Sequence, residues 1–277
     1  MNLLRSVASQ TALAVENSRL VSAIASETAD REVIQRELAI AREVQQRLFP
    51  QSYPQIPDLE YCGTCRPARE VGGDYYDFLL LPHQNLGIAI GDVSGKGIPA
   101  SLLMASLQAC LRGQTMAGST SIHRLMENID HLIYAATPSN RYATFFYGQY
   151  DPDLRRLTYV NAGHNAPIIL RYSHSSYECL RLEVGEPPVG LLPHCQYESA
   201  YVDLQPGDTL VFFTDGISEA MNSADEEWGE CCLIEAATNS IACRPAEMVQ
   251  EIFRAADAFT AGAPQHDDMT VVVARII

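Results

Sequence analysis

Four aspartates beside predicted strand ends have the chemistry to hold divalent metal ions. They are Asp74, Asp92, Asp215 and Asp267. A carboxylate beside buried strands is costly unless an opposite charge compensates it, and none of the four has an evident Arg or Lys partner in the sequence. Hard oxygen ligands favour magnesium or manganese over zinc or copper. An Asp-Gly step alone is usually a turn, so the prediction of a shared metal centre rests on the joint occurrence of the four.

The segments around these aspartates resemble the motifs of a known family. In this order they resemble the metal-dependent (PPM-type, or type 2C) protein serine/threonine phosphatases, and most closely the SpoIIE/RsbU branch of bacteria. The resemblance covers roughly residues 38–277. The motifs are GGDYYD at Gly72–Asp77, GDVSGKG at Gly91–Gly97, NAGHN at Asn161–Asn165, TDGI at Thr214–Ile217 and DDMT at Asp267–Thr270.

The resemblance implies a role for each aspartate. Asp92 would bridge two manganese or magnesium ions, and the backbone carbonyl of Val93 would be a further ligand. Asp74 would complete the site of one ion, and Asp215 with Asp267 that of the other. A water activated by these ions would then hydrolyse phosphoserine or phosphothreonine without a covalent phospho-enzyme.

Residues near the motifs have further roles by the same resemblance. Arg69 lies five residues before Asp74, where better-known type 2C enzymes carry an arginine that clamps the substrate phosphate; a solvated surface arginine is the alternative. Asp77 and Asp268 would orient metal-bound waters from a second layer, or are solvated carboxylates. Ser94 stands where many type 2C enzymes have a histidine proposed as general acid, so the proton donor to the leaving group stays open.

Apolar patterning predicts the elements that would position these residues. Strands alternate with two separated helical groups, which predicts an α+β fold with antiparallel sheets covered by helices. The resemblance implies a central β-sandwich with helices on both faces. Strands are expected over 59–68, 74–81, 86–92, 142–150, 157–161, 166–172, 178–183, 197–204, 209–214 and 269–276, and helices over 99–113, 121–136 and 245–259.

The N-terminal residues 1–49 contain no Gly and no Pro and are rich in helix-forming residues. A heptad-like frame passes through Leu13, Leu20, Ile24 and Ile34, with polar interruptions. This pattern predicts a helical connector that pairs as a parallel coiled coil in a homodimer. The alternative is a single amphipathic helix that lies on its own domain.

A domain boundary is expected at Pro50, because Pro50, Pro54 and Pro57 would end the helix. Residues 50–277 would then form the phosphatase domain. Residues 3–20 resemble the last helix of a GAF sensor domain, which would make the connector the tail of an upstream sensor.

Composition excludes several classes of partner. A net charge of −15 argues against nucleic acid and anionic membranes. No apolar run approaches the length that spans a bilayer, and the N-terminus lacks the pattern of a secretory leader, so a cytoplasmic location is expected. Cys62 and Cys65 form a CxxC without a second CxxC or a spaced His pair, so the eight cysteines are read as reduced thiols rather than a zinc site.

These observations favour a cytoplasmic manganese- or magnesium-dependent protein serine/threonine phosphatase in bacterial sigma-factor (partner-switching) signalling. By the resemblance, the phosphoprotein substrate would be an anti-sigma-factor antagonist with a STAS-type fold. Two alternatives stay open: a catalytically silent interaction module with the same fold, and a phosphohydrolase that acts on small phosphate esters. The presence of all four aspartates disfavours the silent module, which has no chemical need of them.

Overall fold

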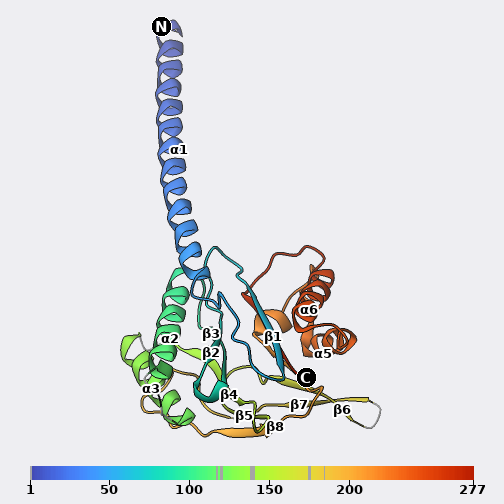
Figure 1. Cartoon of the computed structure of the whole chain (residues 1–277). Helices are drawn as coiled ribbons and strands as arrows, with labels where there is room; N and C mark the ends of the chain where they lie inside the picture. Colours follow the sequence, from blue (N-terminus) through green and yellow to red (C-terminus); the bar gives the residue numbers. More distant parts are fainter. Residues whose placement is uncertain (1, 117, 119–120, 138–140, 174–175, 184) are drawn as a thin grey trace. The chain divides into compact units, whose positions relative to one another are not determined.

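The computed structural model of the chain describes residues 2–116, 118, 121–137, 141–173, 176–183 and 185–277 (Figure 1). It divides into two units, Met1–Val44 and Gln45–Ile277. Nearly all of the first unit is one helix, α1 (Asn2–Gln46), as the absence of Gly and Pro predicts. Within the described residues, no helix is both long enough and apolar enough to cross a membrane.

The heptad-like frame of α1 is exposed from Leu13 to Ile34, whereas Leu38, which continues it, is half-buried. Leu13, Leu20, Ile24 and Ile34 have exposed fractions between 53% and 63%. Apolar side chains that follow one face of a helix normally pack against another surface. The exposure is therefore consistent with the predicted pairing of helices, which stays a prediction.

The second unit contains two five-stranded antiparallel sheets among its described residues. The α+β class and the antiparallel sandwich predicted from the sequence are confirmed. The first sheet has the order β1 (Leu59–Arg66), β10 (Met269–Ile276), β9 (Thr209–Phe213), β6 (Ile168–Ser173) and β7 (Ser176–Arg181). The second has the order β2 (Tyr75–Leu80), β3 (Leu86–Val93), β4 (Ala143–Asp151), β5 (Arg156–Ala162) and β8 (Ala200–Asp203).

The two sheets pack face to face around a shared apolar core. Ile90 of β3, Phe146 of β4 and Phe212 of β9 are fully buried in it. The neighbouring residues on the same strands point outward, toward the helices, because successive side chains of a strand alternate between its faces. Strands covered on both faces read as nearly continuous apolar runs, which is why β3, β9 and β10 were predictable from the sequence.

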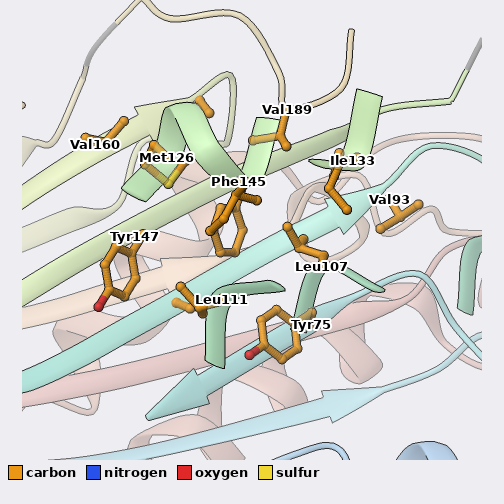
Figure 2. Packing of buried hydrophobic residues seen from close by; sticks show 14 of the residues in the cluster. Tyr75, Val93, Leu107, Leu111, Met126, Ile133, Phe145, Tyr147, Val160 and Val189 are labelled. Carbon is orange, nitrogen blue, oxygen red and sulfur yellow. The ribbon is translucent and has the colours of Figure 1, made fainter. Parts of the chain in front are cut away.

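Helices cover the outer face of each sheet (Figure 1). On the second sheet lie α2 (Ile98–Met116) and α3 (Ile122–Ala136). Figure 2 shows Leu107 and Leu111 of α2 close to Tyr75 of β2 and Phe145 of β4. On the first sheet lie α5 (Gly229–Asn239) and α6 (Pro245–Thr260), while the short α4 (Asp215–Ser218) follows β9 directly.

The predicted element bounds differ from the structure at a few places. The strand expected over 197–204 is limited to Ala200–Asp203. The helix α5 was missed, because only Leu233 and Ala237 of its eleven residues are buried and so short an apolar pattern does not stand out. The last strand has the predicted bounds, Met269–Ile276.

Candidate metal centre

The strand topology brings the four aspartates to one end of the sandwich in two pairs. Asp74 precedes β2 and Asp92 lies near the end of β3, and these antiparallel neighbours pair Tyr75 with Gly91. In the other sheet, Asp215 follows β9 and Asp267 precedes β10. Because the end of one antiparallel strand lies beside the start of its neighbour, each sheet presents two carboxylates at the same end.

Two hydroxyl groups join the pairs across the sandwich. Thr214 and Thr270, from the first sheet, donate hydrogen bonds of 2.7 Å and 2.6 Å to Oδ2 of Asp74. Asp74 is only 2% exposed, and these bonds leave its Oδ1 for another partner. Sequence reasoning missed both threonines, although each lies inside a motif that was singled out, directly before Asp215 and three residues after Asp267.

The carboxylates raise one another's pKa values. Burial and then the charge of Asp92 hold the pKa of Asp74 well above its ordinary value. Burial, followed by the charges of Asp215 and Asp267, raises the pKa of Asp92 to about 8. The pKa of Asp215 is raised by burial and by Asp267. Four carboxylates in one another's field require a compensating cation if they are to ionise together.

Lys96 supplies part of that compensation. Its Nζ lies 2.7 Å from Oδ2 of Asp267 and donates to the carbonyl oxygen of His266 at 2.6 Å. Oδ1 of Asp267 accepts the backbone N–H of Asp268. These two contacts leave lone pairs on both oxygens of Asp267, so a metal ion could bind this carboxylate beside the lysine ammonium.

The donor set fits a hard divalent cation. The four side chains offer only carboxylate oxygens, which are the ligands of magnesium and manganese. The Val93 carbonyl lies beside Gly73, next to Asp74: a Cβ at Gly73 would be 2.9 Å from that oxygen. Among the described residues, no three His, Cys, Asp or Glu side chains converge tightly enough on one point to hold an ion as they stand. Binding would thus need side-chain movement.

Asp268 fixes the loop that carries Asp74. Its Oδ1 accepts the backbone N–H of Ala68 at 2.7 Å, and its Oδ2 accepts that of Gly73 at 2.6 Å. The loop approaches so closely that a Cβ at Gly72 would lie 2.3 Å from Oδ2 of Asp268, which leaves room only for glycine. Asp268 therefore holds backbone in place, whereas the sequence interpretation gave it the orientation of metal-bound waters.

Replacing Asp268 by Ala should weaken manganese binding by about 10- to 100-fold, the usual effect of removing a group that positions a ligand. The reason is that two buried N–H groups would lose their acceptor and Asp74 would lose its fixed position. Calorimetric titration of the variant with manganese would measure the change. The manganese affinity of Asp268→Asn, which keeps one acceptor oxygen, should lie between those of the wild type and Asp268→Ala. Asp225→Ala, on an exposed loop, is the control. Equal affinities for wild type and Asp268→Ala would contradict this role.

The loop before Asp74 is also held by the end of α1. The side chain of Gln45 donates to the carbonyl oxygen of Gly72 at 2.7 Å and accepts the Gly72 N–H at 3.1 Å. Gln45 is 6% exposed and belongs to the second unit. The last turn of α1 is therefore joined by two hydrogen bonds to the segment that carries a predicted metal ligand.

Asp77 lies away from the other aspartates, on the face of β2 that is covered by α2. Its carboxylate is fully buried and accepts two hydrogen bonds from Arg112, at 2.8 Å and 3.0 Å, and one from the Tyr75 hydroxyl. Asp77 and Tyr75 are two residues apart and so share one face of the strand. The contacts of Asp77 thus join β2 to α2 and do not match the predicted orientation of metal-bound waters.

Arg69 is exposed near the mouth of the site. Its Nη1 would lie 3.7 Å from a Cβ placed at Gly97, so the guanidinium reaches the loop that follows Asp92. No ion pair or hydrogen bond occupies Arg69 within the part of the chain that the structure describes. The predicted phosphate clamp, which needs free guanidinium donors, stays a prediction for Arg69.

Ser94, His164 and His266 lie in or beside the motifs and are the residues to consider as general acid. The first two are engaged in other contacts. Ser94 Oγ accepts the N–H of Tyr142 at 3.0 Å. The Nδ1 of His164 lies 3.0 Å from Thr144 Oγ1, and burial lowers the pKa of this histidine to about 3. His164 is therefore neutral near pH 7 and holds no proton that it could readily give to a leaving group. His266 is exposed at the rim of the site.

Comparison with known proteins gives three kinds of match. The model of the family described as stage II sporulation protein E (SpoIIE) matches residues 82–277. Protein IcfG of Synechocystis sp. is 30% identical over 281 residues, covering 92% of this chain and 44% of that protein. Phosphoserine phosphatase RsbU of Bacillus subtilis is 31% identical over 188 residues, covering 67% of this chain and 54% of that protein. The chain thus spans about half the length of the curated relatives it matches.

A solved structure shares the fold. The SiaA-PP2C domain of Pseudomonas aeruginosa superposes with a TM-score of 0.77 at 19% identity, covering 90% of this chain and 98% of that domain. At this level of identity the match concerns the fold, which therefore includes the sandwich, the flanking helices and the strand ends on which the aspartates lie.

Proposed function

Because the chain belongs to the SpoIIE family, whose phosphatases depend on metal ions, we propose that it is a metal-dependent protein serine/threonine phosphatase. The name of its relative RsbU, a phosphoserine phosphatase, supports phosphoserine as the substrate group. One observation carries the proposal: the two aspartate pairs lie at the same end of the sandwich. The hydroxyl groups of Thr214 and Thr270, from the first sheet, donate hydrogen bonds to Asp74 of the pair on the second sheet and so connect the two pairs. Buried acidic clusters of this kind are typical of sites that bind divalent ions.

In this proposal two ions, manganese or magnesium, share Asp92. Asp74 and the carbonyl of Val93 belong to one ion, and Asp215 and Asp267 to the other. Bound ions would supply Lewis acidity and an activated water for in-line attack on the phosphorus atom. The threonine hydroxyls keep Asp74 oriented, and Lys96 lies beside Asp267.

The proposed task of Arg69 is to hold the substrate phosphate. Arg69→Ala should raise KM for a phosphoserine peptide about tenfold while kcat changes less, because a charge-assisted pair contributes about 1.5 kcal/mol or more to binding. The KM of Arg69→Lys should be intermediate, since lysine keeps the charge but cannot form the bidentate contact. Steady-state kinetics would measure both constants, with Arg124→Ala, an exposed arginine of α3, as control. An unchanged KM for Arg69→Ala would remove Arg69 from the site.

The substrate and the setting are further parts of the proposal. We propose a phosphorylated anti-sigma-factor antagonist with a STAS-type fold as substrate, in partner-switching signalling. Residues 1–49 would be a connector that forms a homodimer, supported by the exposed apolar frame of α1, and residues 50–277 the phosphatase domain. All eight cysteines are free thiols, which suits a reducing compartment, and a cytoplasmic location belongs to the same proposal.

The test is phosphate release from a phosphoserine peptide and from an aryl phosphate, each with manganese and with a chelator. The proposal expects hydrolysis of both that requires the metal, with the larger kcat/KM for the peptide. A preference for small esters would favour the small-ester hydrolase instead. No release from either substrate with any divalent ion would favour the silent interaction module.

A further inference from the structure

A cavity of about 510 Å³ opens beside the acidic centre. Asp267, Lys96 and Gly216 line it on the side of the centre. The opposite wall comes from the end of α6 and the segment that follows it, with Ala263 and Pro264. The volume is in the range of small-ligand sites, about 300–1,000 Å³. A substrate whose phosphate lies at the aspartates therefore has this cavity directly next to it.

The two cationic side chains of the cavity are already paired. Arg66 donates two hydrogen bonds to Asp257, at 3.0 Å and 2.7 Å, and its guanidinium lies 5.0 Å from the ring centre of Phe253. Lys96 is paired with Asp267 at 2.7 Å. Since each cation already faces a carboxylate, neither calls for a further charged group in the occupant, although Nε of Arg66 is buried without an acceptor among the described residues.

The rest of the lining favours an apolar occupant. Glu219 and Asp267 place carboxylates on the wall, so an acidic occupant would meet repulsion. Half of the ten uncharged lining residues have apolar side chains, which stabilise a buried apolar group by about 0.8 kcal/mol for each CH₂. These side chains are Ala220, Met221, Ala263, Pro264 and Met269.

We propose that this cavity receives an apolar side chain of the phosphoprotein substrate that lies within two or three residues of the phosphoserine. Each residue of an extended chain spans about 3.3–3.6 Å, so such a residue reaches a cavity that adjoins the aspartates. The proposal rests on the proposed function, and it adds a preference for particular neighbours of the phosphoserine. The cavity would thus distinguish phosphoproteins that present the same phosphate to the same aspartates.

Filling the cavity tests this assignment. Ala263→Trp and Met221→Trp lie in its wall, and Leu154→Trp, at a side chain 62% exposed in the β4–β5 turn, is the matched control. The substrates are an aryl phosphate and phosphoserine peptides with Leu, Ala or Asp at the flanking positions. The intact chain should prefer the Leu peptide over the Ala peptide by about tenfold, a usual range for a few methylene groups, and should disfavour Asp.

Both cavity variants should lose the preference for Leu, with kcat/KM for that peptide about tenfold lower, while aryl phosphate hydrolysis and melting temperature match those of Leu154→Trp. An unchanged preference would overturn the proposal. So would a parallel loss on both substrates, which indicates damage to the centre rather than to a side-chain pocket. A wild type that hydrolyses neither substrate would contradict the proposed function itself, and with it this assignment.

Discussion

Asp92→Asn is expected to lower manganese-dependent phosphate release by about a thousandfold or more, equivalent to about 4 kcal/mol of transition-state stabilisation. Asn keeps the size of the side chain but removes the charge that both ions would share. Asp215→Asn should have a similar effect through one of the two sites. Aryl phosphate hydrolysis under saturating manganese would measure both, and Asp153→Asn, on an exposed turn, is the control.

A second consequence separates Asp92 from an ordinary structural carboxylate. Without metal, burial and then the charges of Asp215 and Asp267 raise the pKa of Asp92 to about 8. The neutral Asn should therefore stabilise the metal-free protein, while the increase in melting temperature on adding manganese should shrink or vanish. A variant that is less stable without metal, or that keeps wild-type activity, would contradict the assignment of Asp92 to the metal centre.

Arg112→Leu is expected to lower the free energy of unfolding by about 2–4 kcal/mol, because it leaves the Asp77 carboxylate buried without its cation. Asp77 has no exposed surface, whereas the Arg112 side chain is 43% exposed, which limits the loss to this range. Urea unfolding would measure it. Arg254→Leu is the matched control, since its pair with Glu251 is exposed on one helix and should contribute less than about 1 kcal/mol.

The double variant Asp77→Leu with Arg112→Leu identifies the cause. If the loss in Arg112→Leu comes from the unpaired charge, removing that charge should restore most of the stability. If the double variant loses as much free energy of unfolding as the two single variants together, the contribution of Arg112 comes from packing of its aliphatic part against the sheet. Equal stability of Arg112→Leu and wild type would show that the buried carboxylate does not depend on this pair.

Much of the fold was predictable because its strands are covered on both faces. The runs that end in Phe213 and begin at Met269 are mostly apolar, so their bounds stand out in the sequence. The helix α5 carries too few buried side chains to give a period, and it was missed for that reason. The start of the strand expected over 197–204 was misjudged, because β8 lies at the edge of its sheet and, among the described residues, pairs only with β5.

The candidate site was predictable only in part, because the sequence gives types and order but no contacts. The four aspartates were selected by type and by their motifs, and the strand ends bring them to the same end of the sandwich. The sequence could not give the direction in which Asp77 points, nor its pairing with Arg112, which lies 35 residues away. The contacts of Asp268 and the two threonines depend on two sheets packing together, and no local pattern contains that information.

The most direct test of the account is the titration of metal-free protein with manganese, followed by calorimetry. The wild type should bind about two manganese ions saturably. Asp92→Asn should bind them much more weakly, and Asp215→Asn should bind only one ion, at the tighter of the two sites. The absence of saturable binding, or binding that is the same in both variants as in the wild type, would show that the four aspartates do not form a metal centre.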